Sequence, residues 1–145
     1  MHINELLKLG VIRKSTNIYC SPAFIVHNHN EQMRGKSRMV IDYRRLNDNT
    51  IDDVYDIPDK TEWIDSIQNS KIFSKFDCKS GFWHIKMHPD SIEWTAYTYP
   101  LGHYELLVMP FGLNSAHSIF QCKMDNIFNK YKSFVCVLYR WYTSL

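Results

Sequence analysis

The sequence lacks long apolar runs, closely spaced cysteines and a strong net charge. No stretch approaches the roughly 20 apolar residues that a membrane-spanning helix requires, and residues 1–10 lack the apolar core of a secretory signal. The four cysteines lie far apart and form no Cys-x-x-Cys pair, which is not the pattern of a disulfide-stapled secreted domain. We therefore expect an intracellular protein with reduced thiols and no association with a membrane.

The charge balance also argues against a surface dedicated to nucleic acid. The 145 residues include 17 basic and 15 acidic side chains, giving a net charge of +2 and no overall basic footprint. Any contact with a polynucleotide must therefore be local. Glycine and proline occur five times each and fall singly, and repeats and low-complexity tracts are absent, so the composition indicates one folded unit without an internal boundary.

Turn residues and apolar periodicity predict an α+β fold, with helices packed on a mostly antiparallel sheet. Residues Ile3–Leu9, followed by Gly10, have the pattern of the last turns of a helix with a glycine C-cap. Further elements are expected in chain order: a hairpin of Pro22–Val26 and Arg38–Tyr43, a helix after Pro58 with Trp63, Ile64 and Ile67 on one face, a strand Lys71–Cys78, a hairpin of Trp94–Tyr99 and His103–Met109 around Pro100-Leu101-Gly102, an amphipathic helix from Ser115 or Ser118 through Phe128, and a strand Phe134–Leu138.

Asp77 is the first candidate for chemistry, because it stands at the end of an apolar segment that is expected to be a strand. A carboxylate at such a position can hold a hard cation through oxygen ligands, and Mg²⁺ is the natural candidate. The same placement also suits an aspartate that caps a turn, so its spacing leaves both interpretations open. The pairs His27 with His29 and His84 with His88 have no cysteine or carboxylate at zinc-ligand spacing, which argues against a zinc site.

Two strings resemble the catalytic motifs of reverse transcriptases, the RNA-directed DNA polymerases. Residues 73–82 (FSKFDCKSGF) resemble the first motif, and residues 108–113 (VMPFGL) resemble the second, in the family's order and separation. Residues 21–26 (SPAFIV) and 38–47 (RMVIDYRRLN) are similar to the fingers hairpin. Within this family, the sequence is most similar to plant pararetroviruses of the caulimovirus group, and Ty3/gypsy retrotransposons are the second choice. The segments that carry this similarity are Arg45–Thr50, Trp94–Ala96 and Phe120–Asp125.

The resemblance implies the fingers and partial palm of a right-hand polymerase over residues 1–137, and it implies roles for single residues. Asp77 would be the first metal-binding carboxylate, and the backbone carbonyl of Cys78 could add a ligand. Two Mg²⁺ ions would then activate the primer 3′ hydroxyl and stabilise the leaving pyrophosphate. Phe82 matches the bulky residue that excludes a ribose 2′ hydroxyl, although an aromatic core residue fits this position equally well.

The remaining implied roles concern the incoming nucleotide. Lys36 and Arg38 match basic residues that contact the triphosphate, where cationic side chains are needed; for Lys36 a solvated hairpin charge is the alternative. Phe111 and Gly112 match a turn that lies against nucleotide and template, where glycine permits close approach of the backbone. The expected partners are an RNA or DNA template-primer and deoxynucleoside triphosphates.

The sequence departs from the family pattern in two places. Residues 114–117 read Asn-Ser-Ala-His where the family usually has Lys-Asn-Ala-Pro. After Val137 the family continues with a Tyr-x-Asp-Asp hairpin that carries the other two metal carboxylates, but Leu138–Leu145 reads LYRWYTSL, and no acidic residue follows Asp125.

We expect residues 138–145 to be an aberrant tail. If residues 138–145 are written as a plausible set of codons and one base is removed, the new frame reads Tyr-Ile-Asp-Gly, which is close to the Tyr-x-Asp-Asp of the family. This indicates a shifted reading frame. The expectation is therefore an inactive fragment of an RNA-directed DNA polymerase. A non-catalytic nucleic-acid-binding remnant and a functionless pseudogene product are the alternatives.

Overall fold

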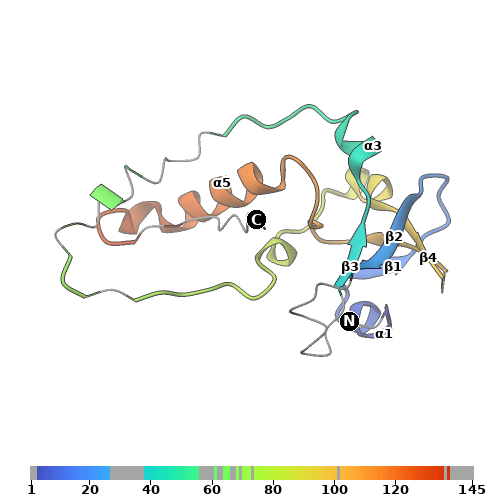
Figure 1. Cartoon of the computed structure of the whole chain (residues 1–145), viewed down its shortest axis with the longest axis horizontal. Helices are drawn as coiled ribbons and strands as arrows, with labels where there is room; N and C mark the ends of the chain where they lie inside the picture. Colours follow the sequence, from blue (N-terminus) through green and yellow to red (C-terminus); the bar gives the residue numbers. More distant parts are fainter. Residues whose placement is uncertain are drawn as a thin grey trace.

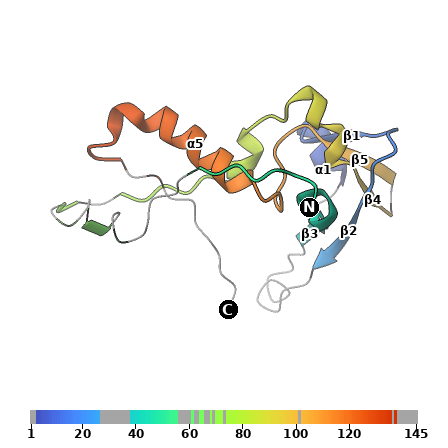
Figure 2. The same ribbon diagram turned by 90° about the horizontal axis from the view of Figure 1, so that it is seen from above.

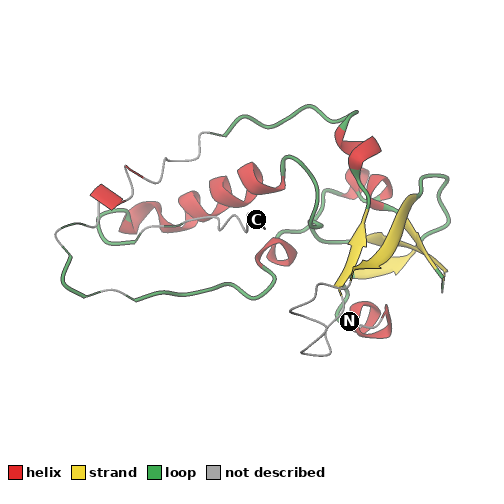
Figure 3. Cartoon of the chain, in the orientation of Figure 1, coloured by secondary structure: helices red, strands yellow, loops and turns green. Residues whose placement is uncertain are grey.

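The computed structural model describes residues 3–26, 38–55, 61, 64–65, 68, 70–72, 74–100, 102–135 and 137. Its sheet has five strands in the order β1-β5-β4-β2-β3, and Figures 1 and 3 show these strands gathered at one end of the molecule. The predicted α+β class is confirmed. The strands are β1 (Ile12–Lys14), β2 (Ser21–Val26), β3 (Arg38–Ile41), β4 (Tyr97–Tyr99) and β5 (Gly102–Leu106), and the α-helices are α1 (Ile3–Lys8), α3 (Arg44–Asn47) and α5 (Ala116–Phe128). The described residues also include four short 3-10 helices: η1 (Gly81–His84), η2 (Pro89–Ser91), η3 (Glu93–Thr95) and η4 (Asn129–Tyr131).

Both predicted hairpins form. β2 and β3 pair antiparallel with Phe24 opposite Val40, and β4 and β5 pair antiparallel with Tyr97 opposite Tyr104. The two hairpins join through a short parallel pairing of β2 with β4, in which Ser21 lies opposite Tyr97. Because of this pairing, the fingers hairpin and the β4–β5 hairpin form one sheet.

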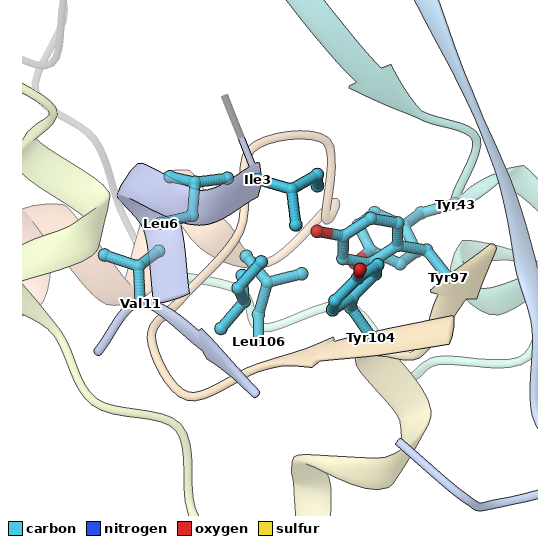
Figure 4. Close-up of a cluster of buried hydrophobic side chains, with 8 residues drawn as sticks. Ile3, Leu6, Val11, Tyr43, Tyr97, Tyr104 and Leu106 are labelled. Atoms are coloured by element: carbon cyan, nitrogen blue, oxygen red, sulfur yellow. The ribbon is translucent and has the colours of Figure 1, made fainter. Parts of the chain in front are cut away.

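The main core lies between α1 and the sheet. α1 ends as predicted at a left-handed glycine, since Gly10 has φ +66° and its N–H donates to the carbonyl of Leu7. Figure 4 shows Ile3 of α1 beside the rings of Tyr43, Tyr97 and Tyr104, with Leu6 of the same helix on the side of Val11, and all six side chains are buried. Burial of these large rings is the main source of stability at this end of the molecule.

The long helix α5 follows the predicted apolar spacing and extends away from the sheet (Figure 2). Its first turn packs into a second, smaller core through Ala116, which is buried with Phe82 and Met109. Ser115 occupies the N-cap position but makes no side-chain hydrogen bond to the helix. The predicted helix and the N-cap position of Ser115 are therefore confirmed, but the capping hydrogen bond expected from a serine side chain is not made. None of the helices in the described part of the chain has the length and apolarity that crossing a bilayer demands.

Three predicted strand segments are wrong in whole or in part. The described residues of Lys71–Cys78 form no strand, and neither do those of Phe134–Leu138. An extended segment becomes a strand only when its backbone pairs with another, and neither segment has a partner among the described residues. The strand predicted from Trp94 begins only at Tyr97, because residues Glu93–Thr95 form η3.

Some predictions fall largely outside the described residues. Of the helix expected after Pro58, only Thr61, Ile64 and Asp65 are described, and they are helical. The tail of residues 138–145 lies outside, as does the hairpin turn that contains Lys36.

Candidate nucleotide site

The second catalytic-motif string meets the first at the small core. Ser80 has φ +52°, a left-handed conformation that turns the chain into η1 and directs Phe82 inward. Phe82 is 2% exposed, and its ring centroid lies 5.0 Å from that of Phe111 and 5.5 Å from that of Phe120. Two side chains with predicted roles, from strings some thirty residues apart, are thus in direct contact.

The turn that contains Gly112 is held from the fingers side by Asn47. The Nδ2 of Asn47 donates to the carbonyl of Gly112 at 2.9 Å, and its Oδ1 accepts from the N–H of Asn114 at 3.1 Å. Gly112 has φ +98°, which side-chain-bearing residues rarely adopt, so glycine is required here for its backbone conformation. Asn47 therefore fixes a turn that only glycine can make.

Tyr43 supports the same turn from beneath. Its Cδ2 lies 3.7 Å from the position that a Cβ on Gly112 would take, and its Oη donates to the carbonyl of Thr95 at 2.8 Å. Burial raises the pKa of the Tyr43 phenol, and the nearby phenol of Tyr97 adds to the shift, so the hydroxyl remains a neutral donor. The turn thereby rests on the main core of the sheet.

Asp42 and Arg44 form a two-point ion pair between β3 and α3. Arg44 Nε donates to Oδ1 of Asp42 at 2.9 Å, and Nη2 donates to Oδ2 at 2.5 Å. The side-chain hydrogen bonds from Arg44, followed by the bond from its backbone N–H, lower the pKa of Asp42 to about 2. Arg44 and Arg45 are both exposed, but the charge of Arg44 is already paired with Asp42.

Asp77 and Cys78 lie in the chain just before the turn at Ser80 that leads into this cluster of aromatic rings. Both are exposed, in an irregular segment where Phe76 is 91% exposed. Within the described ranges no group of three or more histidine, cysteine or acidic side chains is placed to hold a metal ion. One exposed carboxylate does not fit a two-metal centre, which needs several oxygen ligands held together.

The basic residues expected near the triphosphate are described only in part. Arg38 begins β3, where it pairs with Val26, and its side chain lies outside the described set, as does all of Lys36. An open groove beside Gly112 is lined by Asp52, Asp53 and Asn114 among others. Asn114 stands where the family usually has lysine, so this groove offers acidic carboxylates without that basic side chain.

Asn47 and Tyr43 are the supporting residues that sequence reasoning did not assign. Both lie in residues 38–47, which resemble the fingers hairpin. That resemblance predicted the hairpin but no contact of these two side chains with the Gly112 turn. The partner of Tyr43 is 52 residues away in the chain, and the partner of Asn47 is 65 residues away. No local pattern reports a side-chain bond across such a separation.

The architecture and the sequence together define the class of protein. The chain is similar to the foamy viral protease-reverse transcriptase solved with an RNA/DNA hybrid (TM-score 0.72, 22% identity, 92% of this chain and 18% of that one). It is also similar to the same enzyme with dsDNA (TM-score 0.71, 24% identity, 92% and 27%). These likenesses establish the polymerase fold.

Residues 26–140 match the family "Reverse transcriptase (RNA-dependent DNA polymerase)", and the chain belongs to that family. The enzymatic polyprotein of Cauliflower mosaic virus (strain CM-1841) is 50% identical over 135 residues, covering 93% of this chain and 20% of the polyprotein. The putative enzymatic polyprotein of Cassava vein mosaic virus is 50% identical over 141 residues, covering 94% and 22%. The predicted similarity to caulimovirus proteins is confirmed, and the chain spans about a fifth of the length of these relatives.

Proposed function

We propose that this chain is the fingers and partial palm of an RNA-directed DNA polymerase and that it supplies the nucleotide-facing side of the active site. The observation that carries this proposal is the contact of Phe82 with Phe111 beside the Gly112 turn, which Asn47 holds. Three strings that resemble separate family motifs thereby converge on one surface. Membership in the family supports the same conclusion.

The burial of Phe82 refines its role in selecting the sugar. Its side chain is 2% exposed, whereas Phe111 in front of it is 53% exposed. In this arrangement an incoming nucleotide meets the ring of Phe111, and Phe82 packs behind that ring to keep it in place. We therefore assign the exclusion of a ribose hydroxyl to the two rings acting together, with Gly112 allowing the close approach of the nucleotide.

The proposed substrates are deoxynucleoside triphosphates and a primer-template of RNA or DNA. Solved relatives of this fold carry an RNA/DNA hybrid or dsDNA. Lys36 and Arg38 would contact the triphosphate. A divalent ion is general in this family, and Asp77 with the carbonyl of Cys78 would hold Mg²⁺ only together with the carboxylates of a Tyr-x-Asp-Asp hairpin, which residues 138–145 lack. An intracellular location is the one that the four separated cysteines favour.

We propose further that the chain as it stands does not complete nucleotidyl transfer. Leu138–Leu145 contains no carboxylate where the family has Tyr-x-Asp-Asp, and Asp77 alone cannot hold two metal ions. A non-catalytic contact with nucleic acid is the second candidate function, because the two strands of the fingers hairpin pair with each other and join the sheet through β2, even though Asp77 is not in a strand.

Primer extension on an RNA template with Mg²⁺ tests both statements. We compare the chain as it stands with a chain whose tail is restored to Tyr-Ile-Asp-Asp and followed by a thumb domain, and with the restored chain carrying Asp77→Asn. Extension by the restored chain alone is the expected result, and it locates the loss of activity in the tail. Extension by the unrestored chain would contradict the proposed inactivity, and extension by the Asp77→Asn variant would contradict the role of Asp77.

A further inference from the structure

One buried side chain on α5 has an oxygen that the described residues leave without a donor. Gln121 is 1% exposed, and its Nε2 donates to Oδ1 of Asp125 at 3.0 Å and to the backbone carbonyl of Val137 at 3.2 Å. Its Oε1 is buried and has no hydrogen-bond partner among the described residues. Native proteins rarely leave a buried amide oxygen in this state, because its desolvation is costly. Gln121 can therefore accept one more hydrogen bond.

The two acceptors around Nε2 fix the orientation of the Gln121 amide. If the amide were turned over, Oε1 would face the Asp125 carboxylate and the Val137 carbonyl, which are acceptors themselves. Asp125 lies one helical turn after Gln121, and its Oδ2 accepts from the hydroxyl of Tyr55 at 2.7 Å. Tyr55 also lines the open groove beside Gly112. A series of hydrogen bonds thus runs from this groove through α5 to Val137, and it holds the amide in place.

We propose that Gln121 is a positioning residue that holds Val137 by both of its backbone groups. In an extended strand the N–H and the C=O of one residue point to the same side, so one side-chain amide can bond to both. Nε2 already binds the carbonyl of Val137. Oε1 accepts from the N–H of the same residue when the strand that the sequence predicts around Val137 forms. The described residues there form no strand, which accounts for the one bond that is made and the one that is not.

This inference rests on the proposed function and concerns the metal side of the same site. The Tyr-x-Asp-Asp carboxylates of the family come directly after the position of Val137, where this chain has a different tail. A strand that slips by one residue turns every side chain to the opposite face. A two-point contact at Val137 therefore sets the direction in which the next side chains point. Gln121 would act here as Asn47 acts on the Gly112 turn, since each amide fixes the backbone of a distant segment.

Amide hydrogen exchange measured by NMR tests the two-point contact without an assay of activity. The main sample is the restored chain, which has the Tyr-Ile-Asp-Asp tail and a thumb domain, and near-ultraviolet circular dichroism checks its fold. The Val137 N–H is expected to exchange at least about tenfold more slowly in this chain than in its Gln121→Met variant, which has a side chain of similar length but no amide. Gln121→Asn keeps a polar amide that is one methylene shorter, and it is expected to lose most of the same protection.

Two further samples provide the controls. Asn126→Met makes the same amide-to-thioether change at an exposed position of α5 and is expected to leave the exchange of the Val137 N–H unchanged. In the chain as it stands, Gln121→Met is expected to move the carbonyl ¹³C resonance of Val137, because the hydrogen bond from Nε2 is lost. This second comparison tests the half of the contact that the structure already contains.

Primer extension by the restored chain separates positioning from packing. Gln121→Met is expected to lower kcat by about tenfold and to raise the Mg²⁺ concentration at half-maximal rate by about tenfold. The KM for the nucleotide is expected to stay the same, because Asn47 still holds the Gly112 turn. A residue that only packed the helix would change stability without this split between kcat and KM.

The outcomes distinguish this inference from the proposed function. Equal exchange at Val137 in the restored chain and its Gln121→Met variant would overturn the two-point contact, and a buried water would then be the donor to Oε1. Protection that depends on Gln121 in a restored chain without activity would support the contact and contradict the proposed function. An active restored chain whose Gln121→Met variant kept its kcat and Mg²⁺ requirement would overturn the positioning role alone.

Discussion

The sheet end and the α5 end of this molecule use their apolar side chains in opposite ways. At the sheet end, Tyr97 is fully buried, and every strand has a paired neighbour. At the α5 end, Ile72, Phe76 and Phe134 are 75% exposed or more. In Figure 2 the strands lie at one end, and α5 and the loops beside it lie at the other.

This difference divides the candidate site. Phe111, Gly112 and their support from Asn47 belong to the packed end, because the Gly112 turn rests on Tyr43 and so on the main core. Asp77 belongs to the exposed end, where no strand among the described residues supports it. The nucleotide-facing side of a polymerase site can thus be built by local hairpins, whereas the metal side depends on a strand that must pair with a distant segment.

The largest expected effect comes from breaking the packed end at Tyr97. Tyr97→Ala removes a fully buried ring that packs on Tyr104 with a centroid distance of 5.9 Å, and it is expected to cost about 3–5 kcal/mol of unfolding free energy. Phe76→Ala is the control at the exposed end and is expected to change stability by at most about 0.5 kcal/mol. Urea denaturation of dilute protein measures both.

A third variant separates the ring of Tyr97 from its hydroxyl. The Oη of Tyr97 is buried with no hydrogen-bond partner among the described residues, so Tyr97→Phe is expected to leave stability unchanged or raise it by about 1 kcal/mol. Equal costs for Tyr97→Ala and Phe76→Ala would show that the contrast between the two ends is not energetic.

The next effect concerns the acid stability of the packed end. Burial alone would raise the pKa of Glu105, but hydrogen bonds from Arg13 Nε, Ser15 Oγ and Asn17 Nδ2 outweigh it and lower the pKa. A lowered folded-state pKa stabilises the fold above the ordinary glutamate pKa, and that stability is lost as the pH falls through the folded-state value.

Glu105→Gln is therefore expected to cost roughly 1–3 kcal/mol at neutral pH and to flatten the acid limb of the stability curve. Urea titrations between neutral and acid pH check this. Glu93→Gln, at an exposed position, is the control and should leave the curve unchanged. An acid limb that keeps its slope in the Glu105→Gln variant would assign acid unfolding to other carboxyl groups.

A smaller effect is expected where the packed end supports the site. Asn47→Ala removes both hydrogen bonds to the Gly112 turn, at a cost of about 1 kcal/mol, and frees the amide of Asn114 to exchange faster with solvent. Asn47→Asp keeps the oxygen that accepts from Asn114 and is expected to keep that amide protected. Amide exchange measured by NMR distinguishes the two variants. If the exchange rate of the Asn114 amide were unchanged in Asn47→Ala, the Gly112 turn would keep its conformation without the two hydrogen bonds from Asn47.

The parts of the fold that could be predicted from sequence are the local ones. A helix with its glycine cap at Gly10, two hairpins and the amphipathic α5 each depend on residues close together in the chain. The strand at Lys71–Cys78 was predicted from the same kind of signal, but the described residues of that segment form no strand, because pairing is a property of two segments. The parallel contact of β2 with β4 was also unpredicted, since nothing in either strand specifies a distant partner.

The candidate site divides in the same way. Phe82, Phe111 and Gly112 could be assigned because their strings resemble family motifs, and the structure brings them together. Asn47 could not be assigned, because its two bonds reach a turn far along the chain. The resemblance identified residue types at motif positions, while the side chains that hold them in place became visible only with the fold.

The smallest effect is expected at the boundary between β3 and α3, where the Asp42–Arg44 pair lies at the surface and contributes little to stability. Arg44→Ala is expected to raise the pKa of Asp42 from about 2 toward its ordinary value without reaching it, because the backbone N–H of residue 44 still donates to Oδ1 at 3.1 Å. An NMR titration of the Asp42 carboxyl measures the shift, with Arg45→Ala as the control. If the two variants gave the same Asp42 pKa, the two-point pair would not form in solution. Arg44 would then be as available to phosphate as Arg45.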